Sequence, residues 1–365
     1  MAFSFGFSGD DIDIDESEDN NRIPDVVVPQ GTANSLPELV KASQHDMNDW
    51  LSILPSQIFY NRLAIRETPI VIARREIIDI RTQLMAEDSA DHDNAELIAG
   101  LEEGDLKPNF YEGGFKTWEC ALDLAKLVAS ESAVVESLGD SQTDVHIIEL
   151  GAGTAVPSLA LFAHILSQTQ TARDAPQRKA HFTFADYNEA VLRLVTLPNL
   201  ILTWWSCRSQ SATSDAANEV ISEEELDISA ELVDDFKNDL ARRGISIDFI
   251  SGAWSPEFVD FVFSTRSGSD YKTLVMASET IYSPSSLTAF SETLLSLLRR
   301  SSTNSVKSRA LIAAKKVYFG VGGGVDEFLS VLHNVCADEL EVKHKMDVQS
   351  EGVGRVVLEI APAAK

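Results

Sequence analysis

A glutamate followed by two glycines is the part of this sequence whose residue types point most directly to chemistry. The run VHIIEL, residues 145–150, is aliphatic and too short for a helix, which predicts a strand buried on both faces of a parallel sheet. Gly151 and Gly153 then permit a sharp turn and a close ligand approach, because neither carries a Cβ. Open α/β sheets bind nucleotides at such a loop, at the carboxyl end of a strand.

The residues around this loop favour a cationic nucleotide. A dinucleotide fingerprint would continue to a third glycine or alanine, where this chain has Val156-Pro157. Glu149, directly before the loop, suits the ammonium and sulfonium of S-adenosylmethionine better than a polyphosphate. We therefore expect S-adenosylmethionine as the cofactor and S-adenosylhomocysteine as its product. A dinucleotide enzyme and a purely structural glycine turn are the alternatives.

A second acid, Asp186, closes the next predicted strand. Phe182 and Phe184 alternate with smaller residues in HFTFAD, and the aspartate at its end can accept hydrogen bonds from ribose hydroxyls. Its distance from the glycine loop exceeds the usual spacing of about 20 residues, which the polar connection before the strand explains. The alternative for Asp186 is a turn residue at a strand end.

The elements that must position these acids alternate between strand and helix patterns. We expect an α/β, Rossmann-like seven-strand fold with a mixed sheet and an antiparallel edge. A helix from Glu189 should stop or kink at Pro198, and LILTWW is ambiguous between helix and strand. The other expected strands lie within 247–254, 274–278, 309–316 and 340–360, and the helices within 118–127, 231–243 and 287–298.

The chain is expected to divide into an acidic tail and one catalytic domain. Residues 1–34 are rich in acids and poor in core residues, which predicts disorder. The domain then covers residues 35–365, with an N-terminal extension over 35–109 and a surface insertion over 206–229. Within the extension, residues 63–80 resemble a strand or hairpin arm that covers the approach of the cofactor.

Charge and cysteine content limit the partners. The 57 acidic and 30 basic residues give a net charge of -27, which disfavours nucleic acid and favours a basic protein partner, unless the acidity serves only solubility. The three scattered cysteines indicate neither disulfides nor a metal site. With no apparent signal peptide or membrane span, we expect a monomer in the cytoplasm and nucleus.

Five motifs add a resemblance that covers about residues 110–324. FYEGGFKTWEC, IIELGAG, FADYN, SETIY and YFGVGGG occur in this order. Together they resemble the seven-strand protein methyltransferases, and more narrowly the histidine protein methyltransferase family that modifies a large-subunit ribosomal protein. One departure is Gly252-Ala253-Trp254, where relatives commonly place an acid between the glycine and the tryptophan.

The resemblance implies both a cofactor site and a catalytic pair. Glu279 is expected to orient a substrate imidazole and Tyr282 to position its ring, while the glycines of residues 318–324 leave room for substrate backbone. Trp118 would shield the reacting methyl and Trp254 contact adenine, with core packing as the alternative for both. The cofactor-binding residues are expected to be Thr117, Trp118, Glu119, Cys120, Ala121, Glu149, Gly151, Gly153, Asp186, Tyr187, Asn188, Gly252, Ala253, Trp254 and Ser278.

Two other classes share these features. A lysine or small-molecule methyltransferase would carry the same cofactor motifs. A non-catalytic acidic escort of a basic ribosomal protein would bind its partner without turnover.

Overall fold

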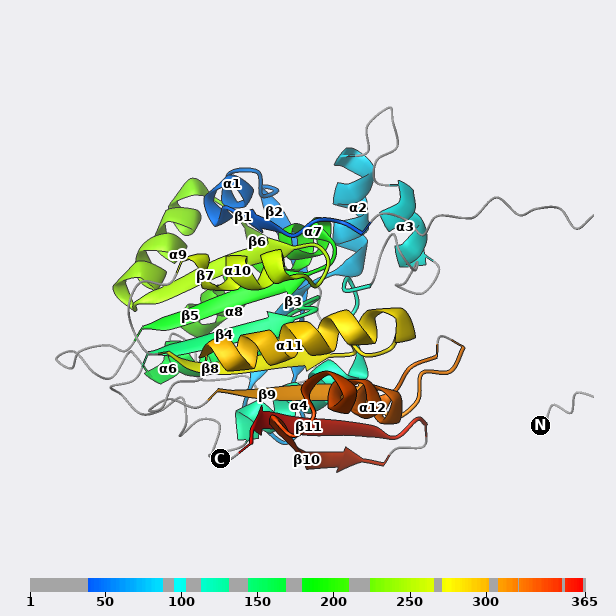
Figure 1. Ribbon diagram of the computed structural model, residues 1–365. Coiled ribbons are helices and arrows are strands. Elements are labelled where there is room, and N and C mark those ends of the chain that lie inside the picture. The colour runs from blue at the N-terminus through cyan, green and yellow to red at the C-terminus, as the bar shows by residue number, and fades with distance from the viewer. Residues whose placement is uncertain are drawn as a thin grey trace, which may run out of the picture. The chain divides into compact units, whose positions relative to one another are not determined.

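A computed structural model of the chain describes most residues from 39 to 363 (Figure 1). The described ranges are 39–87, 95–102, 113–130, 144–168, 179–209, 224–265, 271–301, 308–320, 322–349 and 352–363. The acidic tail expected over residues 1–34 lies outside them.

The centre of the fold is an eight-stranded sheet with the order β1-β7-β5-β4-β8-β9-β11-β10. Its five middle strands are parallel, and β11 and β10 continue it as an antiparallel pair, as expected. The strands are β1 Ser43–His45, β4 Val145–Leu150, β5 Ala180–Asp186, β7 Ile245–Ser251, β8 Lys272–Ser278, β9 Arg309–Lys315, β10 Leu340–Val348 and β11 Arg355–Pro362. The mixed α/β fold is thereby confirmed. The sequence patterns missed β1, which makes the opposite edge antiparallel too.

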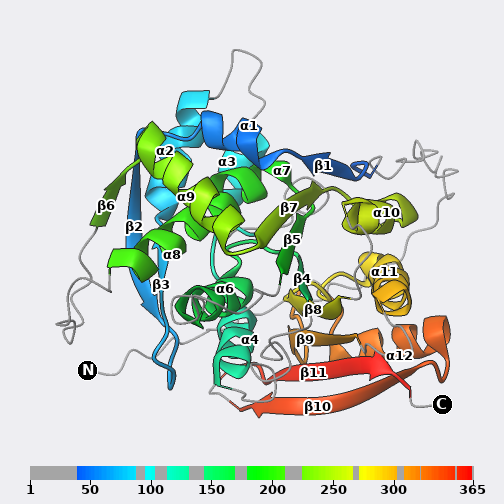
Figure 2. The same cartoon turned by 90° about the vertical axis from the view of Figure 1, so that its left-hand side faces the viewer.

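Helices cover both faces of this sheet (Figures 1 and 2). Because side chains alternate along a strand, Ile147 of β4 packs into one core cluster and Ile148 into the other. The first cluster includes α4 Glu119–Ser130, α6 Val156–Gln168, α8 Leu197–Ser209 and α9 Ala230–Arg242. The second includes α10 Pro256–Ser264, α11 Leu287–Ser301 and α12 Val325–Cys336. The short helix η3, Pro284–Ser286, leads into α11.

Two strands of the N-terminal extension and the later strand β6 Glu224–Asp227 form a second sheet, in the order β3-β2-β6. The hairpin consists of β2 Gln57–Ala64 and β3 Val71–Arg75, and α1 Met47–Ser52 precedes it. The prediction of an extended arm through residue 80 is wrong in its second half. There Ile80 and Leu84 bury one side of α2 Ile77–Glu87, which packs near α3 Ala95–Glu102, so helical spacing decides the conformation.

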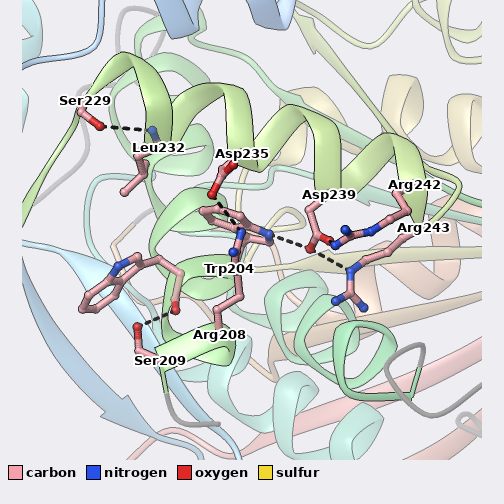
Figure 3. A network of polar contacts seen from close by, with 10 residues as sticks. Trp204, Arg208, Ser209, Ser229, Leu232, Asp235, Asp239, Arg242 and Arg243 are labelled. Atoms are coloured by element: carbon pink, nitrogen blue, oxygen red, sulfur yellow. Dashed lines mark hydrogen bonds and ion pairs between the residues drawn. The ribbon is translucent and has the colours of Figure 1, made fainter. Parts of the chain in front are cut away.

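The ends of the stretch expected as a surface insertion belong to the folded protein. Ser206 is buried near the end of α8, and Glu224–Asp227 forms β6, which pairs with β2. Ser229 caps α9 by accepting a hydrogen bond from the N–H of Leu232 (Figure 3). Residues 210–223 lie outside the described ranges. Residues 206–209 and 224–229 of the expected insertion therefore lie in or next to helices and a strand.

The apolar stretch after Glu189 is helical throughout, so the expected stop at Pro198 is wrong. It begins as α7 Glu189–Val191, passes through the π-helical turn Leu192–Thr196 and continues as α8. Pro198 offers no N–H to the carbonyl of Leu194, four residues earlier, and that carbonyl accepts a hydrogen bond from Nη1 of Arg75 at 3.0 Å. The whole segment, Glu189–Ser209, is long and apolar enough to cross a membrane, yet 78% of its apolar window is buried inside the protein.

A buried carboxylate joins α8 to α9 (Figure 3). Asp239 accepts hydrogen bonds from the indole N–H of Trp204 at 3.0 Å and from Nε of Arg243 at 2.8 Å. Arg243 also donates to the carbonyl of Leu166 at the end of α6, 2.9 Å away. The ion pair of Asp239 and Arg243 therefore links three helices, α6, α8 and α9, on one face of the sheet.

Replacing this carboxylate should destabilise the protein strongly. Asp239→Ala leaves a buried guanidinium without its counter-charge, so we expect a loss of about 3 kcal/mol in the free energy of unfolding. Asp235→Ala is the matched control, because its contact with Arg208 is exposed and should contribute less than about 1 kcal/mol. Urea denaturation measures both. Equal losses would show that the Asp239 pair does not hold the helices.

Candidate functional site

The loop between β4 and α6 is tied to the end of β5 by the carboxylate of Asp186. Oδ2 accepts a hydrogen bond from the N–H of Gly153 at 3.0 Å, and Oδ1 accepts one from the N–H of Asn188 at 3.2 Å. The side chain is nearly buried, yet each carboxylate oxygen can accept more than one hydrogen bond. Asp186 therefore organises both loops.

Gly151 and Gly153 have the positive φ angles that the sequence predicted, 65° and 51°. A Cβ on Gly151 would lie 2.7 Å from Cγ2 of Thr280, in the loop after β8. A Cβ on Gly153 would lie 3.2 Å from Cα of Gly114. Both glycines are thus required by packing between loops, whether or not a ligand is bound.

Glu149 lies behind the glycine loop. It is 1% exposed, and its Oε2 accepts a hydrogen bond from the N–H of Ser158 in the first turn of α6. Burial raises the pKa of Glu149 to about 8; the Ser158 hydrogen bond opposes this shift and the neighbouring Asp186 adds to it. Within the described residues Oε1 has no hydrogen-bond partner. The expected direct contact with the amino-acid end of a ligand is therefore not favoured by this placement.

Residues 117–121 enter α4 beside the loop. The hydroxyl of Thr117 lies 3.0 Å from that of Thr154, and Trp118 is half-buried, with Nζ of Lys315 5.1 Å from its ring centre. Glu119 is exposed and pairs with Lys315 at 2.9 Å. Cys120 and Ala121 are buried in the core, which leaves their side chains little access to a ligand.

Glu279 follows β8 in a left-handed conformation, with φ 57°. Its Oε1 accepts a hydrogen bond from the N–H of Cys120 at 3.4 Å and lies 3.7 Å from Nζ of Lys315. Its Oε2 is buried and has no hydrogen-bond partner among the described residues. A non-glycine residue in this conformation stores about 1 kcal/mol or more of strain, a feature that clusters at functional sites.

Two tyrosines lie near Glu279. The rings of Tyr282 and Tyr318 are 6.3 Å apart in an edge-to-face arrangement. Burial first, and the Glu279 charge second, raise the pKa of Tyr318 and likewise that of the Cys120 thiol. Both groups therefore stay protonated beside the carboxylate.

The glycines of the loop after β9 do not leave the expected room for substrate backbone. A Cβ on Gly323 would lie 2.4 Å from the carbonyl oxygen of Tyr282, and one on Gly324 would lie 2.5 Å from that of Lys316. The chain itself fills this space. Gly320 has open surroundings, next to Phe319, which is 79% exposed.

The segment Gly252–Trp254 is held by the N-terminal extension. The N–H of Ala253 donates to the carbonyl of Val40 at 2.9 Å, and that of Gly252 donates to the carbonyl of Asp186 at 3.0 Å. These two N–H groups are occupied, which argues against their donating hydrogen bonds to adenine. Trp254 packs edge-on against Phe258, with ring centres 5.2 Å apart.

The remaining predicted residues lie close to these positions. Tyr187 accepts a hydrogen bond from the N–H of Val40 through its hydroxyl, 3.4 Å away, Asn188 is the N-cap of α7, and Ser278 is the last residue of β8. The predicted residues thus gather on the loops at the carboxyl ends of β4, β5, β7 and β8 and at the start of α4. Their roles toward a ligand stay predictions.

Sequence reasoning missed the cations of the site. Lys315 lies between the carboxylates of Glu119 and Glu279, and Arg74 of β3 donates to the hydroxyl of Thr117 at 2.8 Å. The only available signal was that both follow an apolar strand pattern, in ALIAAKK and IVIARR. No group of His, Cys, Asp and Glu in the described part of the chain could hold a metal ion.

Curated relatives match most of the chain. It is 32% identical to histidine protein methyltransferase 1 of Saccharomyces cerevisiae, covering 98% of each chain. It is 34% identical to histidine protein methyltransferase 1 of Schizosaccharomyces pombe, over 89% of this chain and 86% of that protein. A rat homologue is 31% identical over 70% of this chain and 58% of its own length.

Among solved structures, magnesium protoporphyrin IX methyltransferase of Synechocystis PCC 6803 covers 78% of this chain and 98% of its own, with a TM-score of 0.32 at 12% identity. A methyltransferase from Streptococcus mutans covers 69% of this chain and 52% of its own, with a TM-score of 0.35 at 9% identity. No family model matches the chain.

The buried Glu149 should make stability depend on pH. Since the raised pKa means that the folded protein binds this proton more tightly than the unfolded chain, its contribution is lost as pH rises from about 4.5 to about 8. Glu149→Gln should therefore gain free energy of unfolding relative to the parent by up to about 1.4 kcal/mol per pH unit in that window. Urea denaturation at several pH values measures this difference. For Asp235→Asn, at an exposed carboxylate, the curve of unfolding free energy against pH should stay parallel to that of the parent. If the curve for Glu149→Gln is parallel to that of the parent, folding does not raise the pKa of Glu149.

Proposed function

Because this chain belongs to the histidine protein methyltransferase family, we propose that it methylates a histidine ring nitrogen of a protein, using S-adenosylmethionine. The observation that carries the proposal is Glu279. This strained carboxylate at the end of β8 has one oxygen held by the chain and the other, Oε2, buried without a partner among the described residues. Such an acceptor suits the N–H of an imidazole.

The residues at the carboxyl end of the sheet fit the proposed cofactor. Asp186 closes β5, at the edge of the sheet where α/β folds bind nucleoside ligands, and is proposed to contact the ribose. When bound, S-adenosylmethionine supplies a methyl carbon activated by a positively charged sulfur.

The chain's own contribution is orientation and proton handling. With Oε2 of Glu279 accepting the N–H of one ring nitrogen, the lone pair of the other nitrogen is left free to attack. Methylation makes the ring cationic, and the carboxylate that faces its remaining N–H stabilises that charge and can accept the proton. Lys315, at 3.7 Å from Oε1, holds Glu279 in place.

The acceptor protein is proposed to be a basic protein of the large ribosomal subunit. The net charge of -27 supports a basic partner, since opposite charges accelerate encounter. The resemblance of the five motifs to the family that modifies a large-subunit ribosomal protein supports a ribosomal substrate. Tyr282, beside Tyr318, is proposed to contact the substrate ring.

Glu279→Gln should slow methyl transfer about tenfold or more, because the neutral amide binds the imidazole N–H more weakly and cannot take its proton. Single-turnover transfer to the purified substrate protein measures the rate. Calorimetry with S-adenosylhomocysteine is the control and should give an unchanged Kd. An unchanged rate would remove Glu279 from the mechanism.

Labelled S-adenosylmethionine in a cell extract should mark a basic ribosomal protein at histidine, as read by mass spectrometry. Because exposed charges are screened beyond about 8 Å at physiological ionic strength, added salt should lower this activity more than cofactor affinity. Methyl-lysine or a labelled small molecule would contradict the proposed acceptor. Binding of the basic protein without any label would favour the escort alternative.

A further inference from the structure

Arg74 is a half-buried cation near the glycine loop, and no ion pair joins it to a carboxylate in the described part of the chain. It belongs to β3 of the N-terminal hairpin, and within the described residues its one hydrogen bond runs from Nη1 to the neutral hydroxyl of Thr117 at 2.8 Å. Burial lowers its pKa, and the charge of Glu76 offsets this only in part, without forming an ion pair. A guanidinium has five N–H donors, so most of them remain available here.

The neighbouring basic residues, unlike Arg74, have carboxylate partners. Arg75 bonds Asp79, Gln83 and the carbonyl of Leu194. Lys315 pairs with Glu119. Among the described residues Arg74 has no carboxylate partner, and a partly desolvated cation is costly unless a ligand supplies the anion.

Arg74 also reaches the loop that is expected to carry the ligand. Thr117 Oγ1, which accepts from Arg74, lies 3.0 Å from Thr154 Oγ1, and Thr154 directly follows Gly153, whose N–H bonds Asp186. A continuous series of contacts therefore connects the ribose-binding acid at one end of the loop with the cation at the other.

The proposed cofactor has one anionic group to match this cation. Its ammonium and sulfonium suit the acids of the site, whereas its carboxylate, at the far end from the nucleoside, needs a positive partner. Arginine binds carboxylates through two parallel hydrogen bonds, with both geometry and charge favourable.

We propose that Arg74 is a binding subsite for the carboxylate of the cofactor's amino-acid end, with Thr117 and Thr154 orienting its guanidinium. The inference rests on the proposed function, since it assumes an S-adenosyl ligand. It gives the N-terminal hairpin a direct part in ligand binding, beyond covering the loop.

Two ligands that differ at the amino-acid end test the subsite. S-adenosylhomocysteine carries the carboxylate, whereas 5′-methylthioadenosine lacks the amino-acid portion. Arg74→Met should weaken binding of S-adenosylhomocysteine about tenfold to a hundredfold, the value of a charge-assisted hydrogen bond, and leave the Kd for 5′-methylthioadenosine unchanged. Calorimetry measures both, and Arg74→Lys should lose less.

Arg66→Met is the matched control, because Arg66 is exposed in the turn of the same hairpin, and neither Kd should change. If Arg74→Met weakens both ligands equally, or neither, Arg74 serves the fold alone and the subsite is wrong. If the parent protein binds neither ligand, the proposed function fails instead.

Discussion

The hydrogen bond from the N–H of Gly153 to the carboxylate of Asp186 is the contact on which the site depends. It fixes the loop after β4 to the end of β5, and the N–H of Asn188 adds the start of α7 to the same carboxylate. The carbonyl of Gly153 accepts the hydroxyl of Thr196 at 2.7 Å, so the π-helical turn also holds this glycine. Two adjacent strand ends and the helix that follows them thus share one buried anion.

The N-terminal extension completes this arrangement. The backbone N–H of Arg75 in β3 donates to the side-chain oxygen of Asn199 at 2.8 Å, and the side-chain NH2 of Asn199 donates to the carbonyl of Thr154 at 3.1 Å. On the other side of the site, a Cβ on Gly252 would lie 2.4 Å from the carbonyl oxygen of Lys41. The loops of the site are therefore held from both sides by residues that precede the nucleotide-binding motif in the chain.

The sequence predicted the parts of the fold that depend on local pattern. The continuous apolar runs of β4, β5 and β8 lie where expected, because strands buried on two faces leave little ambiguity. The closing pair β10 and β11 also lies where expected. Contacts between distant segments were not predictable. The strand character of Glu224–Asp227 comes from its pairing with β2, and polar composition alone indicated a loop.

The candidate site shows the same division. Residue types and motifs brought Asp186, Glu279 and the glycine loop together correctly as strand-end neighbours. They could not show that Glu149 faces the helix behind the loop, or that the glycines near Tyr282 are filled by the chain. Both depend on the direction of side chains and backbone in the packed structure. Arg74 was missed because only folding brings β3 to the start of α4.

The pairing of β2 with β6 also bears on how the chain reaches its fold during synthesis. Tyr60 of β2 bonds the carboxylate of Glu224, 164 residues later, so the edge of the hairpin stays open until most of the domain has been made. Contacts of such long sequence separation form late, and an open strand edge can pair with another chain in the meantime. The hairpin of β2 and β3 is therefore made early but completed late, when β6 pairs with β2. The acidic residues of β6, Glu224–Asp227, disfavour pairing between two copies of this strand.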